Sequence, residues 1–329
     1  MINLSNKIKV SSRIGLYDYP NIKGTYNVGD YVQSIAAAQF LDEFQFLPRD
    51  DLNNISEKKI LLMNGWHTHK PKNFPPSDNI KPLLISFHLN SDVAEKVLKN
   101  QDVIKFFKKN EPIGCRDVYT KNILNAYGIN AHFSGCLTLT LSNTFKHQPK
   151  NKILLVDPII NANDPKRIFK SLKSFLLLGV KQKGLLNLNE KNNMIKNILK
   201  GFDGVEIKNL ENTKYGNNDP IKRLEEAIDY ISELSSASLV ITSRIHCALP
   251  CASMGVPVIF LDYKFNLKSD RSRFDGILDF FPTFSCHNPQ DLNEINRFAK
   301  EIFGKTISNK IVQKTSDQLT QTVRNFLKE

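Results

Sequence analysis

Short apolar runs alternate with amphipathic stretches along the first half of the chain. Apolar segments at 13–19, 59–65 and 82–88 are typical of strands buried in a parallel sheet. Between the first two, residues 28–44 carry an apolar stripe with a spacing of about 3.6 residues, formed by Val32, Ile35, Ala36 and Phe40. The stripe predicts a helix, and the alternation of such helices with strands predicts an α/β fold.

The same order of elements starts again after a polar segment. Residues 142–152 contain proline and predict a linker, and an apolar strand follows at 153–158. We therefore predict two Rossmann-like domains whose mostly parallel sheets face each other across a cleft. The predicted bounds are 1–145 for the N-terminal domain, 146–315 for the C-terminal domain and 316–329 for a C-terminal helix.

The composition excludes several classes of protein. The chain has 329 residues, of which 24% are charged, and it contains no apolar run of the ~18 residues needed to span a bilayer. It opens without an apolar signal segment, and its five cysteines form no CxxC pair, which favours the cytoplasm. The net charge of +12 suits phosphorylated substrates first and an anionic membrane surface second, because no nucleic-acid-binding motif is present.

A polar corner at the end of one apolar strand carries the most informative chemistry. It consists of Ser243, Arg244 and His246, and a short helix follows directly. The free N–H groups at a helix start favour an anion, Arg244 can grip a phosphate or carboxylate, and His246 can exchange a proton near neutral pH. The alternative is a surface ion pair for Arg244 and a buried structural imidazole for His246. The local sequence leaves both open.

Polar groups stand at other predicted strand ends as well. Gly29 permits a close turn, and Asp30 is either the N-cap of the next helix, which the local pattern favours, or a carboxylate facing the cleft. Arg116 is either an anion ligand or half of a surface pair with Asp117. His88 ends a strand at the same predicted edge. These residues extend the candidate site into the N-terminal domain.

Two loops add further candidates. A proline-rich loop carries the only tryptophan, Trp66, which is either a platform for a sugar ring or a hydrophobic plug. His67 and His69 follow it, but no acid or cysteine cluster accompanies them, so we predict no metal site. Arg271 and Arg273 lie in a polar stretch that predicts a flexible loop, where they either clamp a phosphate or are solvated.

Four segments together resemble the polysaccharide pyruvyl transferase family. They cover most of residues 24–275 in the family's order, and the last two are the more specific: NVGDYVQSIAAAQFL, NGWHTHKPKNFPPSDNIKPLLISFH, EPIGCRDVYTKNILNAYGINAHFSGCLTL and ASLVITSRIHCALPCASMGVPVIFLD. The resemblance implies a fold like that of GT-B glycosyltransferases, with the active site between the domains. It also implies transfer of a pyruvyl group from phosphoenolpyruvate to a sugar diol, which yields a pyruvate ketal and phosphate.

The resemblance also implies roles for individual residues. Arg116 and Arg244 would bind the phosphate and carboxylate of the donor, His246 would be the acid, and Asp30 would face the acceptor. The N-terminal domain would form the acceptor side and the C-terminal domain the donor side. Asp30 or His88 is the predicted base. We predict further donor contacts from Ser243, Arg271 and Arg273. We predict acceptor contacts from Asn27, Gly29, Trp66 and His67.

We therefore predict a pyruvyltransferase of capsular or exopolysaccharide biosynthesis, with phosphoenolpyruvate as co-substrate and no cofactor. The expected acceptor is a lipid-linked oligosaccharide. The basic stretch at 165–180 predicts either a peripheral membrane contact or, as its pattern favours, a core-facing helix with a solvated basic side. The alternative functions are a GT-B-type glycosyltransferase that uses a nucleotide sugar and a non-catalytic scaffold of polysaccharide assembly. Pro250 either tilts the helix that contains it or leaves the carbonyl of His246 free.

Overall fold

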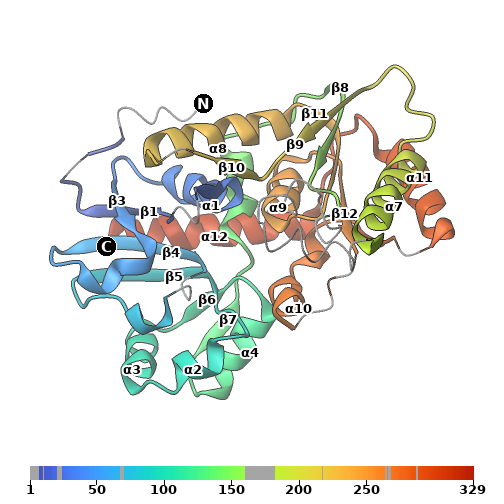
Figure 1. The fold of residues 1–329 in the computed structure, drawn as a ribbon. Helices are drawn as coiled ribbons and strands as arrows, with labels where there is room; N and C mark the ends of the chain where they lie inside the picture. Colours follow the sequence, from blue (N-terminus) through green and yellow to red (C-terminus); the bar gives the residue numbers. More distant parts are fainter. Residues whose placement is uncertain are drawn as a thin grey trace.

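The computed structural model of the protein contains two parallel sheets surrounded by helices (Figure 1). The first sheet has the strand order β3-β1-β4-β5-β6-β7, and all its neighbouring strands are parallel. Its strands are β1 (Ile14–Asp18), β3 (Gln45–Pro48), β4 (Lys59–Trp66), β5 (Ile80–His88), β6 (Ile113–Cys115) and β7 (Ala131–Phe133). The structure describes residues 7–9, 11–20, 24–66, 70–159, 182–216, 218–263, 265, 268–286 and 288–329.

The second sheet has the order β13-β12-β11-β8-β9 and is also parallel throughout. Its strands are β8 (Lys150–Val156), β9 (Glu206–Leu210), β11 (Ala237–Thr242), β12 (Val258–Asp262) and β13 (Thr283–Ser285). In the first sheet β3 lies on the outer side of β1, and in the second sheet β9 lies on the outer side of β8. The strand order therefore reverses between β1 and β4 and again between β8 and β11. Ligands of doubly wound sheets bind beyond the carboxyl ends of the strands at this reversal.

Helices cover both sheets. The first half contains α1 (Val28–Ala38), α2 (Ala94–Leu98), α3 (Gln101–Lys109), α4 (Val118–Ala126) and the 3₁₀ helices η1 (Arg49–Asn54), η2 (Pro71–Asn73) and η3 (Leu137–Asn143). The second half contains α7 (Gln182–Ile198), α8 (Pro220–Ser235), α9 (Ile245–Met254), α10 (Lys268–Phe274), η5 (Leu278–Phe280), α11 (Pro289–Ile302) and α12 (Lys310–Lys328). The α/β prediction with two mostly parallel sheets is confirmed, and the likeness to GT-B enzymes stays a prediction.

Packing fixes the two halves against each other. A short antiparallel ribbon pairs β2 (Thr25–Asn27) with β10 (Thr213–Tyr215), one strand from each half. Arg223 of α8 donates hydrogen bonds to the backbone oxygen of Tyr19 at 2.9 Å and the hydroxyl of Tyr31 at 3.0 Å. One hydrophobic cluster continues from α1 through α8 and α9 to α12, which runs back to the first sheet (Figure 1). The edges of the cavity described below are therefore held by a shared core.

Three sequence-based bounds need correction. The helix predicted at 28–44 ends at Ala38, because the chain turns there to place β3 beside β1. The C-terminal helix starts at Lys310, ahead of the predicted 316. The predicted flexible loop after β12 contains helix α10, since the buried ring of Phe274 anchors it against Phe265, 4.9 Å between centroids. The division into domains at residue 145 stays a proposal. It agrees with the two sheets, because the first sheet ends before this residue and the second begins after it.

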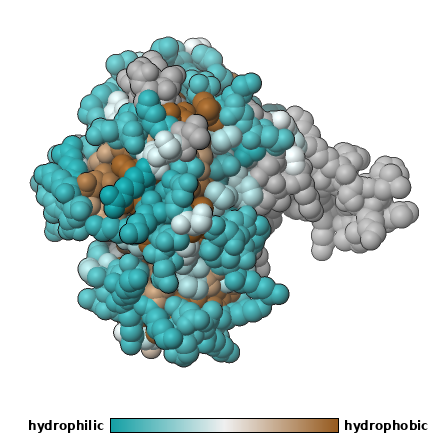
Figure 2. Space-filling view, turned by 90° about the vertical axis from the view of Figure 1, so that its left-hand side faces the viewer, coloured by the Kyte–Doolittle hydropathy of each residue, from teal (hydrophilic) through white to brown (hydrophobic). Residues whose placement is uncertain are grey.

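Hydrophilic side chains predominate on the face of the molecule shown in Figure 2, where hydrophobic ones show through in small areas. Among the helices that the structure describes, none is both long and apolar enough to cross a membrane. The basic stretch at 165–180, for which we predicted a membrane contact or a core-facing helix, lies outside the described residues.

Candidate active site

A cavity of about 440 Å³ lies between the halves, beyond the carboxyl ends of strands from both sheets. Its walls come from α1, α9 and α10 and from the ends of β4, β5, β6 and β11. The structure brings most of the predicted site residues together in this lining, namely Asn27, Asp30, Trp66, His88, Arg116, Ser243, Arg244, His246 and Arg273. Cations and imidazoles from distant segments of the chain thus converge on one volume.

A larger hollow of about 700 Å³ lies at the opposite edge of the first sheet, near the amino ends of β4 and β5. Two of the lysines that line it have close acidic partners: Lys59 lies 2.7 Å from Glu57, and Lys105 lies 3.3 Å from Asp102. Ligands of parallel sheets bind at the carboxyl ends of the strands. We therefore take the smaller cavity, which lies at those ends, as the candidate active site.

Arg244 is held in place by a carboxylate from the neighbouring strand. It stands at the N-cap position of α9, where its backbone N–H donates to Thr242 Oγ1 at 2.9 Å. Its Nε and one terminal nitrogen each lie 2.8 Å from Oδ2 of Asp157, the residue after β8. Asp157 adopts the left-handed region at φ 43°, a conformation that costs energy in a non-glycine residue and is common at functional sites. This contact orients the guanidinium and leaves its other N–H groups for a ligand.

His246 lies in the first turn of α9, and its imidazole faces a strongly cationic surrounding. Its Nε2 atom is buried and has no hydrogen-bond partner among the described residues. Burial lowers the pKa of His246 well below the ordinary value, and the positive charges of Arg116 and Arg273 lower it further. The imidazole of His246 is therefore neutral at neutral pH.

Arg116 and Asp117, which follow β6, are buried, with 3% and 0% of their side chains exposed, so the surface-pair prediction is wrong. Asp117 caps α4 by accepting the backbone N–H of Thr120 at 2.8 Å, and it also lies 2.6 Å from Nδ1 of His88. The buried Nε of Arg116 has no hydrogen-bond partner in the described part of the chain and lies 3.7 Å from Asp117. Arg116 is thus a buried cation at the cavity wall whose Nε–H group can still donate a hydrogen bond to a ligand.

The start of α1 forms the other wall. Asn27 is the N-cap, since its side chain accepts the N–H of Gly29 at 2.9 Å, so the local preference for Asp30 as the cap is wrong. Asp30 stands in the first turn and lines the cavity. Burial raises the pKa of Asp30, and the nearby guanidinium of Arg49 opposes that rise most strongly. A carboxylate with a raised pKa is a better proton acceptor than an ordinary one.

Gly29 and His246 bring the two walls into direct contact. A β-carbon built on Gly29 would lie 3.0 Å from the β-carbon of His246 and 3.1 Å from Oδ1 of Asn27. Gly29 is helical and needs no special backbone angle. It is required because α1 and α9 approach each other closely, and not for the turn that the sequence suggested.

The structure gives different surroundings to the remaining donor-binding candidates, which are Ser243, Arg271 and Arg273. Arg273 lines the cavity, whereas Arg271 lies outside it and forms a two-bonded ion pair with Asp262 at 2.7 and 3.0 Å. Ser243 has its hydroxyl 2.5 Å from the backbone oxygen of Pro158 and 2.7 Å from that of Leu261, so it ties three strand ends together.

Trp66, which the sequence placed in a proline-rich loop, is the last residue of strand β4, and Pro250 lies within α9. Trp66 lines the cavity at the end of β4 and meets the ring of His88 edge to face, with centroids 6.2 Å apart. His67 lies outside the described residues. Pro250 is accommodated within α9, which continues to Met254 and ends at Gly255 in the left-handed region at φ 78°.

Sequence reasoning missed several residues that line the cavity, among them Gln33 and Asn212. It also missed the residues behind the wall: Asp157 was visible only as a polar residue after a strand, Asp117 only as one half of an alternative surface pair, and Arg49 had no motif around it. In the described part of the chain, no group of three or more His, Cys, Asp or Glu side chains is arranged to hold a metal ion. The ionisable groups that line the cavity are arginine guanidiniums, histidine imidazoles and carboxylates.

The fold and the cavity define an α/β protein with a cation-lined site between two parallel sheets. A family model described as polysaccharide pyruvyl transferase matches residues 27–264, which is most of the chain. The protein therefore belongs to the polysaccharide pyruvyl transferase family, as its sequence motifs predicted, and it is a transferase of polysaccharide biosynthesis. A comparison with curated proteins finds no match.

Proposed function

We propose that this protein transfers the pyruvyl group of phosphoenolpyruvate to a sugar diol and forms a pyruvate ketal. The observation that carries the proposal is the pair of buried polar atoms, Arg116 Nε and His246 Nε2, that have no partner among the described residues and belong to one cavity lining. Buried polar groups are almost always hydrogen-bonded. An anionic ligand that also receives a proton would satisfy both atoms.

The donor fits the charge of the cavity. Phosphoenolpyruvate carries a phosphate of about −1.5 to −2 and a carboxylate. Arg116, Arg244 and Arg273 supply three positive charges in the lining, and a guanidinium binds phosphate and carboxylate with paired, charge-assisted hydrogen bonds. In this proposal arginines neutralise the donor, and no cofactor takes part.

The proposed reaction begins with a proton transfer to carbon. Protonated His246 gives its proton to the methylene carbon of the donor, and a sugar hydroxyl adds to the carbon that bears the phosphate. Asp30 takes the proton of that hydroxyl. The bond between this carbon and the bridging oxygen of the phosphate then breaks, and the second hydroxyl closes the ketal. General acid and base groups of this kind each contribute roughly 10²–10⁴-fold to the rate.

Hydrogens and charges balance over the whole reaction. The trianionic donor and a neutral diol give a ketal carboxylate and hydrogen phosphate. One hydroxyl proton replaces the proton that His246 gave to carbon, and the other leaves with the phosphate. We propose a lipid-linked oligosaccharide of capsular or exopolysaccharide synthesis as the acceptor, and a cytoplasmic site of action with peripheral contact to the membrane.

The test measures phosphate release and ketal formation from phosphoenolpyruvate with oligosaccharide acceptors. Arg273→Ala, which removes a cation from the cavity, is expected to weaken donor binding by roughly tenfold or more, as loss of a charged hydrogen bond does. Arg271→Ala is the matched control two positions away, and its donor affinity should equal that of the wild type. Equal donor affinity in both variants, or stabilisation by a nucleotide sugar in place of phosphoenolpyruvate, would refute the proposal.

A further inference from the structure

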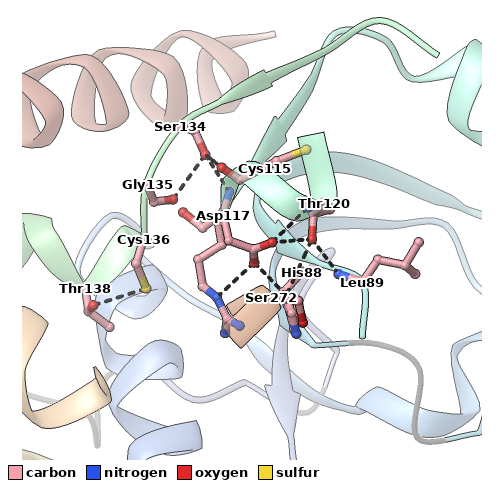
Figure 3. A network of polar contacts seen from close by, with 12 residues as sticks. His88, Leu89, Cys115, Asp117, Thr120, Ser134, Gly135, Cys136, Thr138 and Ser272 are labelled. Carbon is pink, nitrogen blue, oxygen red and sulfur yellow. Dashed lines mark hydrogen bonds and ion pairs between the residues drawn. The ribbon is translucent and has the colours of Figure 1, made fainter. Parts of the chain in front are cut away.

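His88 and Asp117 form a buried pair beside Arg116, one of the arginines proposed to bind phosphoenolpyruvate. Nδ1 of His88 lies 2.6 Å from Oδ2 of Asp117, and both side chains are almost fully buried. The other carboxylate oxygen accepts the backbone N–H of Thr120 at 2.8 Å and its hydroxyl at 2.7 Å (Figure 3). Donors on both oxygens hold the carboxylate in one orientation.

This arrangement determines which nitrogen of His88 carries the proton. Burial would raise the pKa of Asp117, but its contacts with His88, Arg116 and Thr120 outweigh burial and lower that pKa, so Asp117 is ionised. A carboxylate has no proton to give, so Nδ1 of His88 must be the donor. Burial and the charge of Arg116 lower the pKa of His88 despite the opposing effect of Asp117. The neutral ring therefore has a free lone pair on Nε2.

The ring of His88 lies at the wall of the cavity. Its Nε2 makes no hydrogen bond to any described residue. The ring of Trp66 packs against it edge to face. Ser86, two residues earlier in β5, is held in the left-handed region at φ 53° and is buried. Strained backbone of this kind persists where the surrounding structure fixes a functional residue.

The proposed reaction has a place for a second base, because two hydroxyl protons are removed and Asp30 accounts for one. We propose that His88, held in the Nδ1–H tautomer by Asp117, takes the proton of the second hydroxyl and that Asp117 is its positioning residue. The O–H bond of the sugar breaks as its oxygen bonds to the ketal carbon, and the proton moves to Nε2. The imidazolium next to Asp117 then passes this proton to the departing phosphate. This inference rests on the proposed function.

The test is a double-mutant cycle on His88 and Asp117. Asp117→Asn keeps the size of the side chain and its ability to cap α4, but its amide can turn to donate to Nδ1 and so place the proton on Nε2. We expect kcat for ketal formation to fall by roughly 10²–10⁴-fold, while KM for phosphoenolpyruvate stays unchanged. Asp219→Asn is the matched control, since Asp219 caps α8 through Ile221 at 2.9 Å, and its kinetics should equal those of the wild type.

The cycle separates positioning from structural support. If Asp117 acts through His88, then Asp117→Asn costs nothing further in a His88→Ala background. Equal losses in both backgrounds would overturn the inference and leave Asp117 as a helix cap. An inactive wild type would overturn the proposed function and this inference with it, whereas an active wild type with additive losses overturns this inference alone.

A second measurement reports the tautomer without any turnover. Nitrogen NMR of ¹⁵N-histidine-labelled protein distinguishes a protonated Nδ1 from a protonated Nε2, and the signal of His88 is assigned by its loss in His88→Ala. The expected result is Nδ1–H in the wild type and Nε2–H in Asp117→Asn. A wild-type signal with the proton on Nε2 would contradict the inference whatever the kinetics show.

Discussion

Donor binding should pull a proton onto His246. Burial and the charges of Arg116 and Arg273 lower the pKa of this imidazole well below its ordinary value. A single donor charge about 4 Å from the ring contributes about 4 kcal/mol at the effective dielectric constant of about 20 used for protein sites. That energy corresponds to a rise of about 3 pKa units. Bound phosphoenolpyruvate is therefore expected to convert a neutral His246 into the acid that the reaction needs.

Isothermal titration calorimetry measures this proton directly. Binding enthalpies of phosphoenolpyruvate at pH 7.5, collected in buffers of different ionisation enthalpy, give the number of protons taken up. We expect an uptake approaching one, which disappears in His246→Asn and persists in the control Arg271→Ala. Donor affinity should fall as the pH rises, because a complex that binds more protons than its free components is favoured by acid. Zero uptake in the wild type, or full uptake in His246→Asn, would refute the reasoning.

The remaining predictions concern stability. The pKa values of buried His88 and of His246 are both lowered in the folded protein, so the unfolded chain binds more protons than the folded one below about pH 6.5. The free energy of unfolding should therefore decrease as the pH falls below this value, by at most about 1.4 kcal/mol per pH unit for each group. Urea melts from pH 7.5 to 5.5 measure this slope, which His246→Asn should reduce; an unchanged slope contradicts the prediction. Gly29→Ala should destabilise the protein by about 1–3 kcal/mol through overpacking, although alanine favours helices, and should weaken donor binding. A gain in stability would show that α1 and α9 separate easily.

The strand-end residues could be predicted from sequence because the signal is local. An apolar strand, a polar corner and a helix start lie within a few positions of one another, so the residue pattern alone places Arg116, Arg244 and His246 at strand ends. The partner of Arg244 could not be predicted. Arg244 and Asp157 are 87 positions apart, and only the neighbouring places of β8 and β11 in the second sheet bring them together.

The cap of α1 shows a second limit of local reasoning. Asn27 and Asp30 are both good cap residues, and their order along the chain does not choose between them. The choice depends on β2, which pairs with β10 across the two halves and ends at Asn27. Asn212 donates to the same Asn27 oxygen from 185 positions away. Once Asn27 is the cap, Asp30 lies in the first turn and is free to face the cavity.

Arg271 and Arg273 were indistinguishable in a predicted loop, and the helix separates them. Residues two positions apart on an α-helix point about 200° away from each other. When α10 packs through Phe274, Arg273 comes to the cavity and Arg271 to the outer surface beside Asp262. Because no charge pattern in the sequence sets the rotation of so short a helix, tertiary packing alone decides which arginine lines the cavity.

The charges of the cavity explain why the acid and the anion site are built together. Asp157 orients Arg244 and Asp117 lies beside Arg116, so carboxylates behind the cavity wall hold two of the cations in place. Burial, together with the charges of Arg116 and Arg273, lowers the pKa of His246 and so favours the neutral imidazole. Only a bound polyanion reverses that balance. In the proposed reaction, the proton that His246 delivers is therefore loaded by the substrate that will receive it, and we expect a ligand with too little negative charge to leave the imidazole without a proton to give.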